Sequence, residues 1–110
     1  MNKYRNKKCQ YKGIDFDSRK EMYRYIELSS MLKKGTIIDL LIQVKMKVEI
    51  NKKHICYLIL DFVYTDKNGH THYEDVKAFD VKEKKFLTTP VFNLKKKMVE
   101  AYYGIKIELF

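Results

Sequence analysis

The sequence has few of the residues that build cross-linked, membrane-spanning or low-complexity proteins. Among 110 residues there are two cysteines, one proline and four glycines, and there are no repeats. No window approaches the roughly 20 consecutive apolar residues of a membrane span, and the basic N-terminus lacks the apolar stretch of a signal peptide. The cysteines and the three histidines have no metal-binding spacing, which favours free thiols over a disulfide. We therefore expect a cytoplasmic protein without membrane association.

Positive charge, by contrast, is abundant. Lys and Arg number 23 against 14 Asp and Glu, which gives a net charge of +9. A chain of this length is large enough for one core and too short for two. On one small domain such a charge produces a field that attracts polyanions. Nucleic acid is the expected partner, and the alternative is that the lysines only keep the surface solvated.

The first half of the chain has the pattern of a helix followed by three strands. A basic N-terminal arm over residues 1–12 leads, through a short strand or an extended entry, into a helix over residues 18–34. Gly35 stands where a C-cap residue is expected. Three strands follow, at residues 42–50, 54–64 and 70–79.

The second half has the pattern of one more helix and one more strand. Thr89 and Pro90 are a suitable N-cap and first residue for the helix, Gly104 ends it, and residues 105–109 alternate as a short strand. This order predicts an α+β domain with a central mixed β-sheet, antiparallel in its three-strand core and flanked by helices. The second helix has one apolar stripe, the pattern of a face that packs on a core: Val91, Leu94, Met98, Ala101 and Tyr102.

The turn sequence DKNG predicts that two aspartates face each other. It fits a type I turn with Gly69 in the left-handed conformation, which makes a three-residue hairpin loop. In such a loop Asp66 pairs with His70. Counting back along both strands from that pair places Asp61 directly opposite Asp75.

Two opposed aspartates need an explanation, because like charges in directly opposed positions destabilise a hairpin. A hard divalent ion such as Mg²⁺, which is bound by one or two carboxylates, is one explanation. Two alternatives stay open. A loop one residue different in length would set Asp61 opposite Glu74 instead, and Lys77, on the same strand face as Asp75, could neutralise both acids. With the predicted loop, Glu74 points to the other face.

A third acid, Glu21, has two explanations. The sequence from Ser18 to Glu21 is a capping box, in which the glutamate accepts a hydrogen bond from the backbone N–H of the serine. On a helical wheel, however, Glu21 lies within about 40° of Tyr25, Leu28 and Leu32, the inward face. Glu21 could therefore be a cap residue, a site residue or both.

The spacing of Asp61, thirteen residues, and then Asp75-Val76-Lys77 resembles the motif of the PD-(D/E)xK nuclease superfamily. Five segments in order also resemble a family of small phage-encoded nucleases, similar to phage Holliday-junction resolvases of the endonuclease I type. They span residues 13–107 and read GIDFDSRKE, LIQVKMKV, DFVYTDKNG, YEDVKAF and FNLKKKMVEAYYGIKI.

Two positions depart from these patterns. Leu60 stands where the superfamily has its proline, and Ala78 stands where the family usually has glycine. Neither departure removes a metal ligand.

The resemblance implies a restriction-endonuclease-like fold and a metal-dependent DNA endonuclease. Asp61 and Asp75 would bind Mg²⁺ or Mn²⁺, with the carbonyl of Val76 as a further ligand. Lys77 would orient or help deprotonate the attacking water. Glu21 would bind a second ion or a metal-bound water. Junction cutting needs two symmetric incisions, so a homodimer is expected.

The remaining candidate site residues are polar side chains, and for each of them the alternative is an ordinary solvated surface residue. Gln43 would be an auxiliary polar group at the site. Six lysines are candidates for phosphate contacts: Lys7, Lys8 and Lys12 in the arm, and Lys95, Lys96 and Lys97 in the second helix. The competing hypothesis for the whole protein is a non-catalytic module that binds nucleic acid or protein and retains the nuclease fold.

Overall fold

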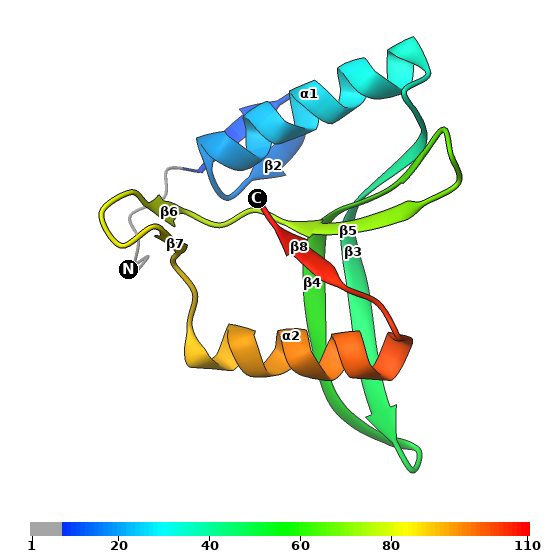
Figure 1. The fold of residues 1–110 in the computed structure, drawn as a ribbon, viewed down its shortest axis with the longest axis vertical. Coiled ribbons are helices and arrows are strands. Elements are labelled where there is room, and N and C mark those ends of the chain that lie inside the picture. Colours follow the sequence, from blue (N-terminus) through cyan, green and yellow to red (C-terminus); the bar gives the residue numbers. More distant parts are fainter. Residues whose placement is uncertain (1–7) are drawn as a thin grey trace.

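The computed structural model describes residues 8–110 and contains two helices, a four-stranded sheet and two small hairpins (Figure 1). Its elements are β1 (Cys9–Tyr11), β2 (Ile14–Phe16), α1 (Arg19–Lys34), β3 (Ile37–Ile50), β4 (Lys53–Asp66), β5 (Thr71–Asp75), β6 (Phe79–Asp80), β7 (Lys85–Phe86), α2 (Pro90–Tyr103) and β8 (Ile107–Leu109). The predicted α+β class is confirmed. Both cysteines are free thiols. Within residues 8–110, no helix is long and apolar enough to cross a membrane.

The main sheet has the strand order β3-β4-β5-β8. The first three strands are antiparallel, as predicted, and β8 lies parallel to β5, which makes the sheet mixed. Strands β3 and β4 have 14 residues each, whereas β5 has five and pairs only with the last part of β4. Among residues 8–110, the rest of β4 therefore pairs with β3 alone.

The long β3–β4 ribbon packs against a different helix at each end. The switch falls between Leu60, which packs with α2, and Phe62, which packs with α1. Asp61 lies at that switch, and Gln43, which lies opposite Asp61 on β3, has φ +51°, a left-handed conformation that interrupts the regular strand. The bend leaves Asp61 between the two helices.

Helix α2 exposes the face that was predicted to be buried. Its caps are as predicted, since Thr89 accepts from the N–H of Phe92 and Gly104 is left-handed. Phe92 and Val99 are the buried residues. Both sides of this helix carry apolar residues, and the side with the aromatic ring, which has more surface to bury, packs on the sheet. Most of the predicted stripe is exposed: Val91 63%, Leu94 60%, Tyr102 50% and also Ala101, with Met98 half-buried.

The predicted N-terminal arm is shorter than 12 residues. Cys9–Tyr11 pairs with Ile14–Phe16 as a small antiparallel hairpin beside α1, because the turn at Lys12 and Gly13 adopts positive φ and reverses the chain. Residues 1–7, which include the candidate Lys7, lie outside the described residues.

Candidate active site

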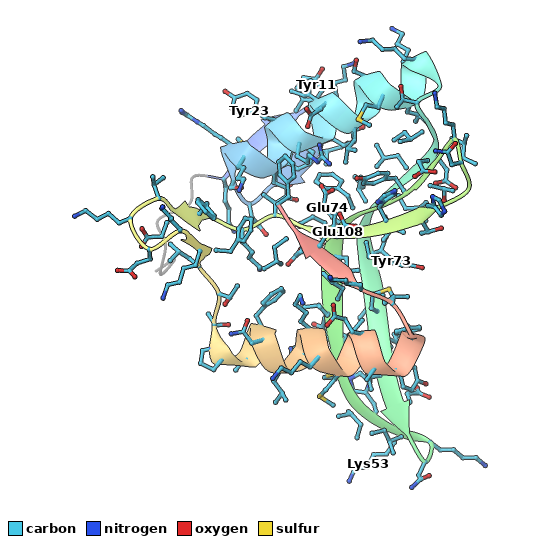
Figure 2. The ribbon with its side chains drawn as sticks, in the orientation of Figure 1. Tyr11, Tyr23, Lys53, Tyr73, Glu74 and Glu108 are labelled. Atoms are coloured by element: carbon cyan, nitrogen blue, oxygen red, sulfur yellow. The ribbon has the colours of Figure 1, made fainter. Side chains whose placement is uncertain are left out.

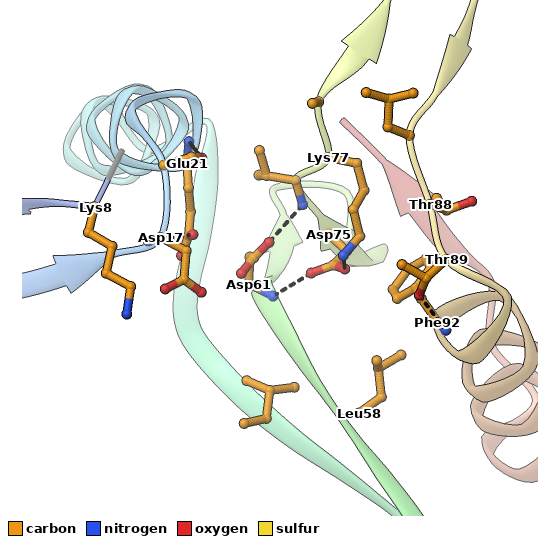
Figure 3. Close-up of a pocket in the computed structure, with 15 residues that line it drawn as sticks. Lys8, Asp17, Glu21, Leu58, Asp61, Asp75, Lys77, Thr88, Thr89 and Phe92 are labelled. Carbon is orange, nitrogen blue, oxygen red and sulfur yellow. Dashed lines mark hydrogen bonds and ion pairs between the residues drawn. The ribbon is translucent and has the colours of Figure 1, made fainter. Parts of the chain in front are cut away.

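The predicted hairpin register is confirmed. The turn closes as expected, and the strand pairs run back to Phe62 opposite Glu74, so that Asp61 and Asp75 are the next opposed residues. The backbone N–H of Asp61 donates to Asp75 Oδ1 at 3.3 Å, and the N–H of Val76 donates to Asp61 Oδ2 at 2.7 Å (Figure 3). Backbone groups thus hold both carboxylates in place.

Glu21 reaches the same place from the first turn of α1, and it is both a cap residue and a site residue. Its N–H donates to Ser18 Oγ at 3.1 Å, as the capping motif predicts. Its carboxylate accepts from the N–H of Asp17 at 3.3 Å, one residue before the position that a capping box uses. The side chain is only 5% exposed. Of the predicted inward face, Leu28 is buried and Leu32, one turn further on, is 39% exposed.

A cavity of about 590 Å³ opens over these acids. Figure 3 shows the carboxylates between α1 with its preceding loop on one side and the start of α2 on the other. Glu21, Asp61, Asp75, Val76 and Lys77 all line it. The structure therefore brings together every residue that the resemblance assigned to metal binding or to water activation.

Four acids, Asp17, Glu21, Asp61 and Asp75, and two described lysines, Lys8 and Lys77, line the cavity. Burial and the neighbouring charge of Asp75 raise the pKa of Asp61 well above its usual range. Burial also raises the pKa of Glu21, and the charges of Asp17 and Asp75 add to that effect. Lys77 is the cation in contact, with its Nζ 3.2 Å from Asp75 Oδ2. Crowded, desolvated carboxylates are the arrangement in which a bound cation is most stabilising.

The donor set fits a hard divalent ion that keeps several non-protein ligands. Mg²⁺ is usually bound through one or two carboxylates, with water and substrate phosphate oxygens completing its shell. Asp61 and Asp75 supply that pair. Within residues 8–110, no group of three or more His, Cys, Asp or Glu side chains is placed to hold a metal ion. An ion at this pair would therefore take most of its ligands from water and substrate.

Gln43 is placed differently from its prediction. It lies opposite Asp61 on β3, but its left-handed backbone turns the side chain toward β2, where Nε2 donates to the carbonyl of Asp15 at 3.1 Å. The exposed amide does not line the cavity. Its role in this structure is to tie β3 to β2.

The candidate lysines are spread over the surface. Lys8 lines the cavity. Lys12 lies in the β1–β2 turn, with its Nζ 5.5 Å from the ring centroid of Tyr11. On α2, Lys96 pairs with Glu100 at 3.2 Å and Lys97 is exposed. Lys95 extends to within 5.6 Å of the ring centroid of Tyr57. None of the three α2 lysines lines the cavity.

Three charged residues near the site were not predicted to contribute. Asp17 lines the cavity. The sequence signal that could have identified it is its position directly before the N-cap Ser18, close to Glu21 in the first turn of the helix. Lys20 donates to the carbonyl of Lys77 at 2.7 Å. Arg24 donates two hydrogen bonds to Glu74. That glutamate lies on the other face of β5, where strand alternation had placed it, and Figure 2 shows it on the side of β5 toward α1.

The chain belongs to the family described as "Protein of unknown function (DUF1064)", whose model matches residues 1–109. No curated protein and no solved structure matches the chain.

Proposed function

We propose that the chain is a Mg²⁺- or Mn²⁺-dependent DNA endonuclease that hydrolyses phosphodiester bonds. The observation that carries the proposal is the pair Asp61 and Asp75, opposed in a cavity with Glu21 and with Lys77 in contact. Opposed buried acids cost stability. A protein with 23 basic residues and a net charge of +9 has cations to neutralise them, yet among residues 8–110 only Lys77 forms an ion pair with either aspartate.

The roles follow from chemistry and position. A divalent ion at Asp61 and Asp75, with the Val76 carbonyl as a further ligand, would lower the pKa of bound water and offset phosphate charge. Glu21 would hold a second ion or a metal-bound water. The Lys77 ammonium lines the same cavity, where it orients or helps deprotonate the attacking water. It also adds positive charge where negative charge develops in the transition state. The basic surface binds the DNA backbone independently of sequence, so binding weakens steeply with salt.

The proposed substrate is branched DNA, and the proposed enzyme is a homodimer acting in the cytoplasm, a host cytoplasm if the chain is phage-encoded. Two copies related by a two-fold axis would place two cavities for paired incisions across a four-way junction.

The test is to incubate purified protein with four-way junction, flap, linear duplex and single-stranded DNA in Mg²⁺ or Mn²⁺. We expect cutting of the junction, and expect Asp75→Ala and Lys77→Ala to abolish it with the fold intact by circular dichroism. Lys34→Ala, which removes an exposed lysine at the far end of α1, is the matched control and should cut normally. Absence of cutting on all four substrates would reject the proposal.

The second candidate is a non-catalytic binding module that retains the nuclease fold. It is favoured by the lack, among residues 8–110, of a complete metal-ligand group. Calorimetric titration with Mn²⁺ separates the two. An active site should bind Mn²⁺ stoichiometrically and lose that binding in Asp61→Asn, whereas a remnant should show no such binding.

A further inference from the structure

An exposed row of side chains leads away from the cavity along β4. Ile59 lines the cavity with Asp61, and Tyr57 and Ile55 follow at every second position. Alternate residues of a strand point to the same face, and the intervening Leu58 packs toward α2. Ile59 is 48% and Tyr57 41% exposed. The row therefore continues the site on the face of β4 that carries Asp61.

The residues of β3 beside this row are lysines. Lys45 pairs with Ile59, and Lys47 pairs with Tyr57. Directly opposed residues lie on one face of a sheet, and both lysines are exposed. The Nζ of Lys45 is 4.3 Å from the ring centroid of Tyr57, and Lys95 approaches the same ring from α2. Tyr57 is thus an exposed aromatic ring between cations.

The charge of this face indicates what binds there. An exposed apolar patch alone would suit a protein partner. The ribbon from Val44 to Leu60, however, contains four lysines and one acid, Glu49. A second copy docked on this face by a two-fold axis would bring the same lysines together, which is repulsive. A polyanion with flat apolar surfaces has the complementary chemistry.

We propose that Lys45, Lys47, Tyr57 and Ile59, here called the Tyr57 track, bind an unpaired segment of the DNA strand whose phosphate enters the cavity. A base stacks on Tyr57 while the lysines bind the flanking phosphates, the combination found in single-strand binding sites. Paired bases in a duplex have no free face for such stacking. This inference rests on the proposed nuclease function and specifies its substrate.

The length of the track limits the segment. Tyr57 and Asp61 are four residues apart on one strand, or about 13 Å at 3.3 Å per residue. At the rise of about 3.4 Å per nucleotide of a stacked strand, that distance spans at most about four nucleotides. We therefore expect a preference for DNA that is unpaired within a few nucleotides of the cut.

Binding is measured without metal, in EDTA, by fluorescence anisotropy of a labelled single-stranded oligonucleotide. Tyr57→Ala should weaken binding about tenfold, because base stacking on an aromatic side chain is worth about 1–3 kcal/mol. Tyr57→Phe keeps the ring and should bind like the wild type. Tyr102→Ala removes a similarly exposed tyrosine from α2 and should also leave binding unchanged. Binding to duplex should respond less to Tyr57→Ala than binding to single strand.

A second measurement does not depend on the ring. Lys45→Gln and Lys47→Gln should each lower the slope of log K against log salt by about 0.7, the value for one phosphate contact on a single strand. Unchanged slopes and an unaffected Tyr57→Ala variant would overturn the track. So would a Tyr57→Ala variant that only converts a dimer to monomers, since the face would then be a protein interface.

The two proposals fail in different ways. Loss of single-strand binding in Tyr57→Ala, from a protein that never cuts in Mg²⁺, would reject the nuclease and keep a DNA-binding track. Cutting of the flap, which carries an unpaired strand, by a Tyr57→Ala variant at the wild-type rate and affinity would keep the nuclease and reject the track.

Discussion

Two consecutive acids at the end of β5 are buried to the same degree but in opposite electrostatic settings. Glu74 is 2% and Asp75 3% exposed. The carboxylate of Glu74 accepts two hydrogen bonds from Arg24, at 2.6 and 2.8 Å, and one from the hydroxyl of Tyr64 at 3.0 Å. Asp75 instead faces Asp61 across the hairpin, with Lys77 as its contacting cation. Burial of an acid alone therefore does not distinguish the candidate site, whereas burial opposite a second acid does.

The largest expected effect is a loss of stability when Glu74 loses its buried cation. Arg24→Met leaves a buried carboxylate without its cation, which should lower the free energy of unfolding by about 3–5 kcal/mol. The stacking of the guanidinium on Phe110, 4.0 Å from the ring centroid, adds to the loss. Urea denaturation measures it. Adding Glu74→Gln should recover part of the stability, and a double variant as unstable as Arg24→Met alone would contradict the buried ion pair as the cause.

The next effect lies on the Asp75 side and is on activity. Glu21→Gln keeps an oxygen that can accept from the N–H of Asp17 but removes the charge from the cavity. We expect cutting to fall about 10²-fold with stability retained. Ser18→Ala, which removes the cap acceptor, should show the reverse, a loss of about 1 kcal/mol with cutting retained. Equal cutting by Glu21→Gln and wild type would reduce Glu21 to a cap residue.

Removing one of the two opposed aspartates should stabilise the metal-free protein. Because burial and the charge of Asp75 raise the pKa of Asp61 to about 10, folding near neutral pH requires this carboxyl to take up a proton at a cost in free energy. Asp61→Asn removes that cost, and its amide oxygen can still accept from the N–H of Val76. We expect a gain of about 1 kcal/mol in EDTA near neutral pH, similar to the free energy of one pKa unit. Asp15→Asn, at an exposed aspartate, is the control and should stay within about 0.5 kcal/mol of wild type. Destabilisation by Asp61→Asn would mean that the acids are not under mutual repulsion.

The positions of Asp61, Asp75 and Glu21 could be predicted from sequence because they depend on short-range geometry. The turn sets the β4–β5 register, and the helical period sets the inward direction of Glu21. The Glu74 side could not, because Arg24 and Glu74 are 50 residues apart and meet only when α1 packs on the sheet.

The orientation of α2 was predicted wrongly because both sides of the helix carry apolar residues, so the pattern alone did not decide between Val91 and Phe92. Strand alternation placed Gln43 on the polar side of its strand, and the residue is exposed. Its place at the site was implied by the resemblance alone, and its positive φ and its hydrogen bond to Asp15 keep the amide out of the cavity.

The smallest expected effect is a pH-dependent change in stability at His72, which lies on the same face of β5 as Glu74. It tests whether the charges on that face are paired. On that face His72 Nε2 lies 2.9 Å from Asp66 Oδ2, its Nδ1 lies 3.6 Å from Glu108 Oε1, and its ring stacks on Tyr64. The hydrogen bond with Asp66 raises the pKa of His72, and it contributes most to lowering the pKa of Asp66 to about 2.

Asp66 therefore stays ionised while His72 changes its charge. A raised folded-state pKa means that the stabilisation is complete below the unfolded value of about 6.5 and is lost as the pH rises through the folded value. Wild type should thus exceed His72→Gln in unfolding free energy at mildly acidic pH, and the difference should shrink at mildly alkaline pH. Urea denaturation at both pH values measures it. Because this charge is paired and lies on the face away from the cavity, His72→Gln should cut DNA at the wild-type rate, and a large loss of cutting would break the contrast between the two faces of β5.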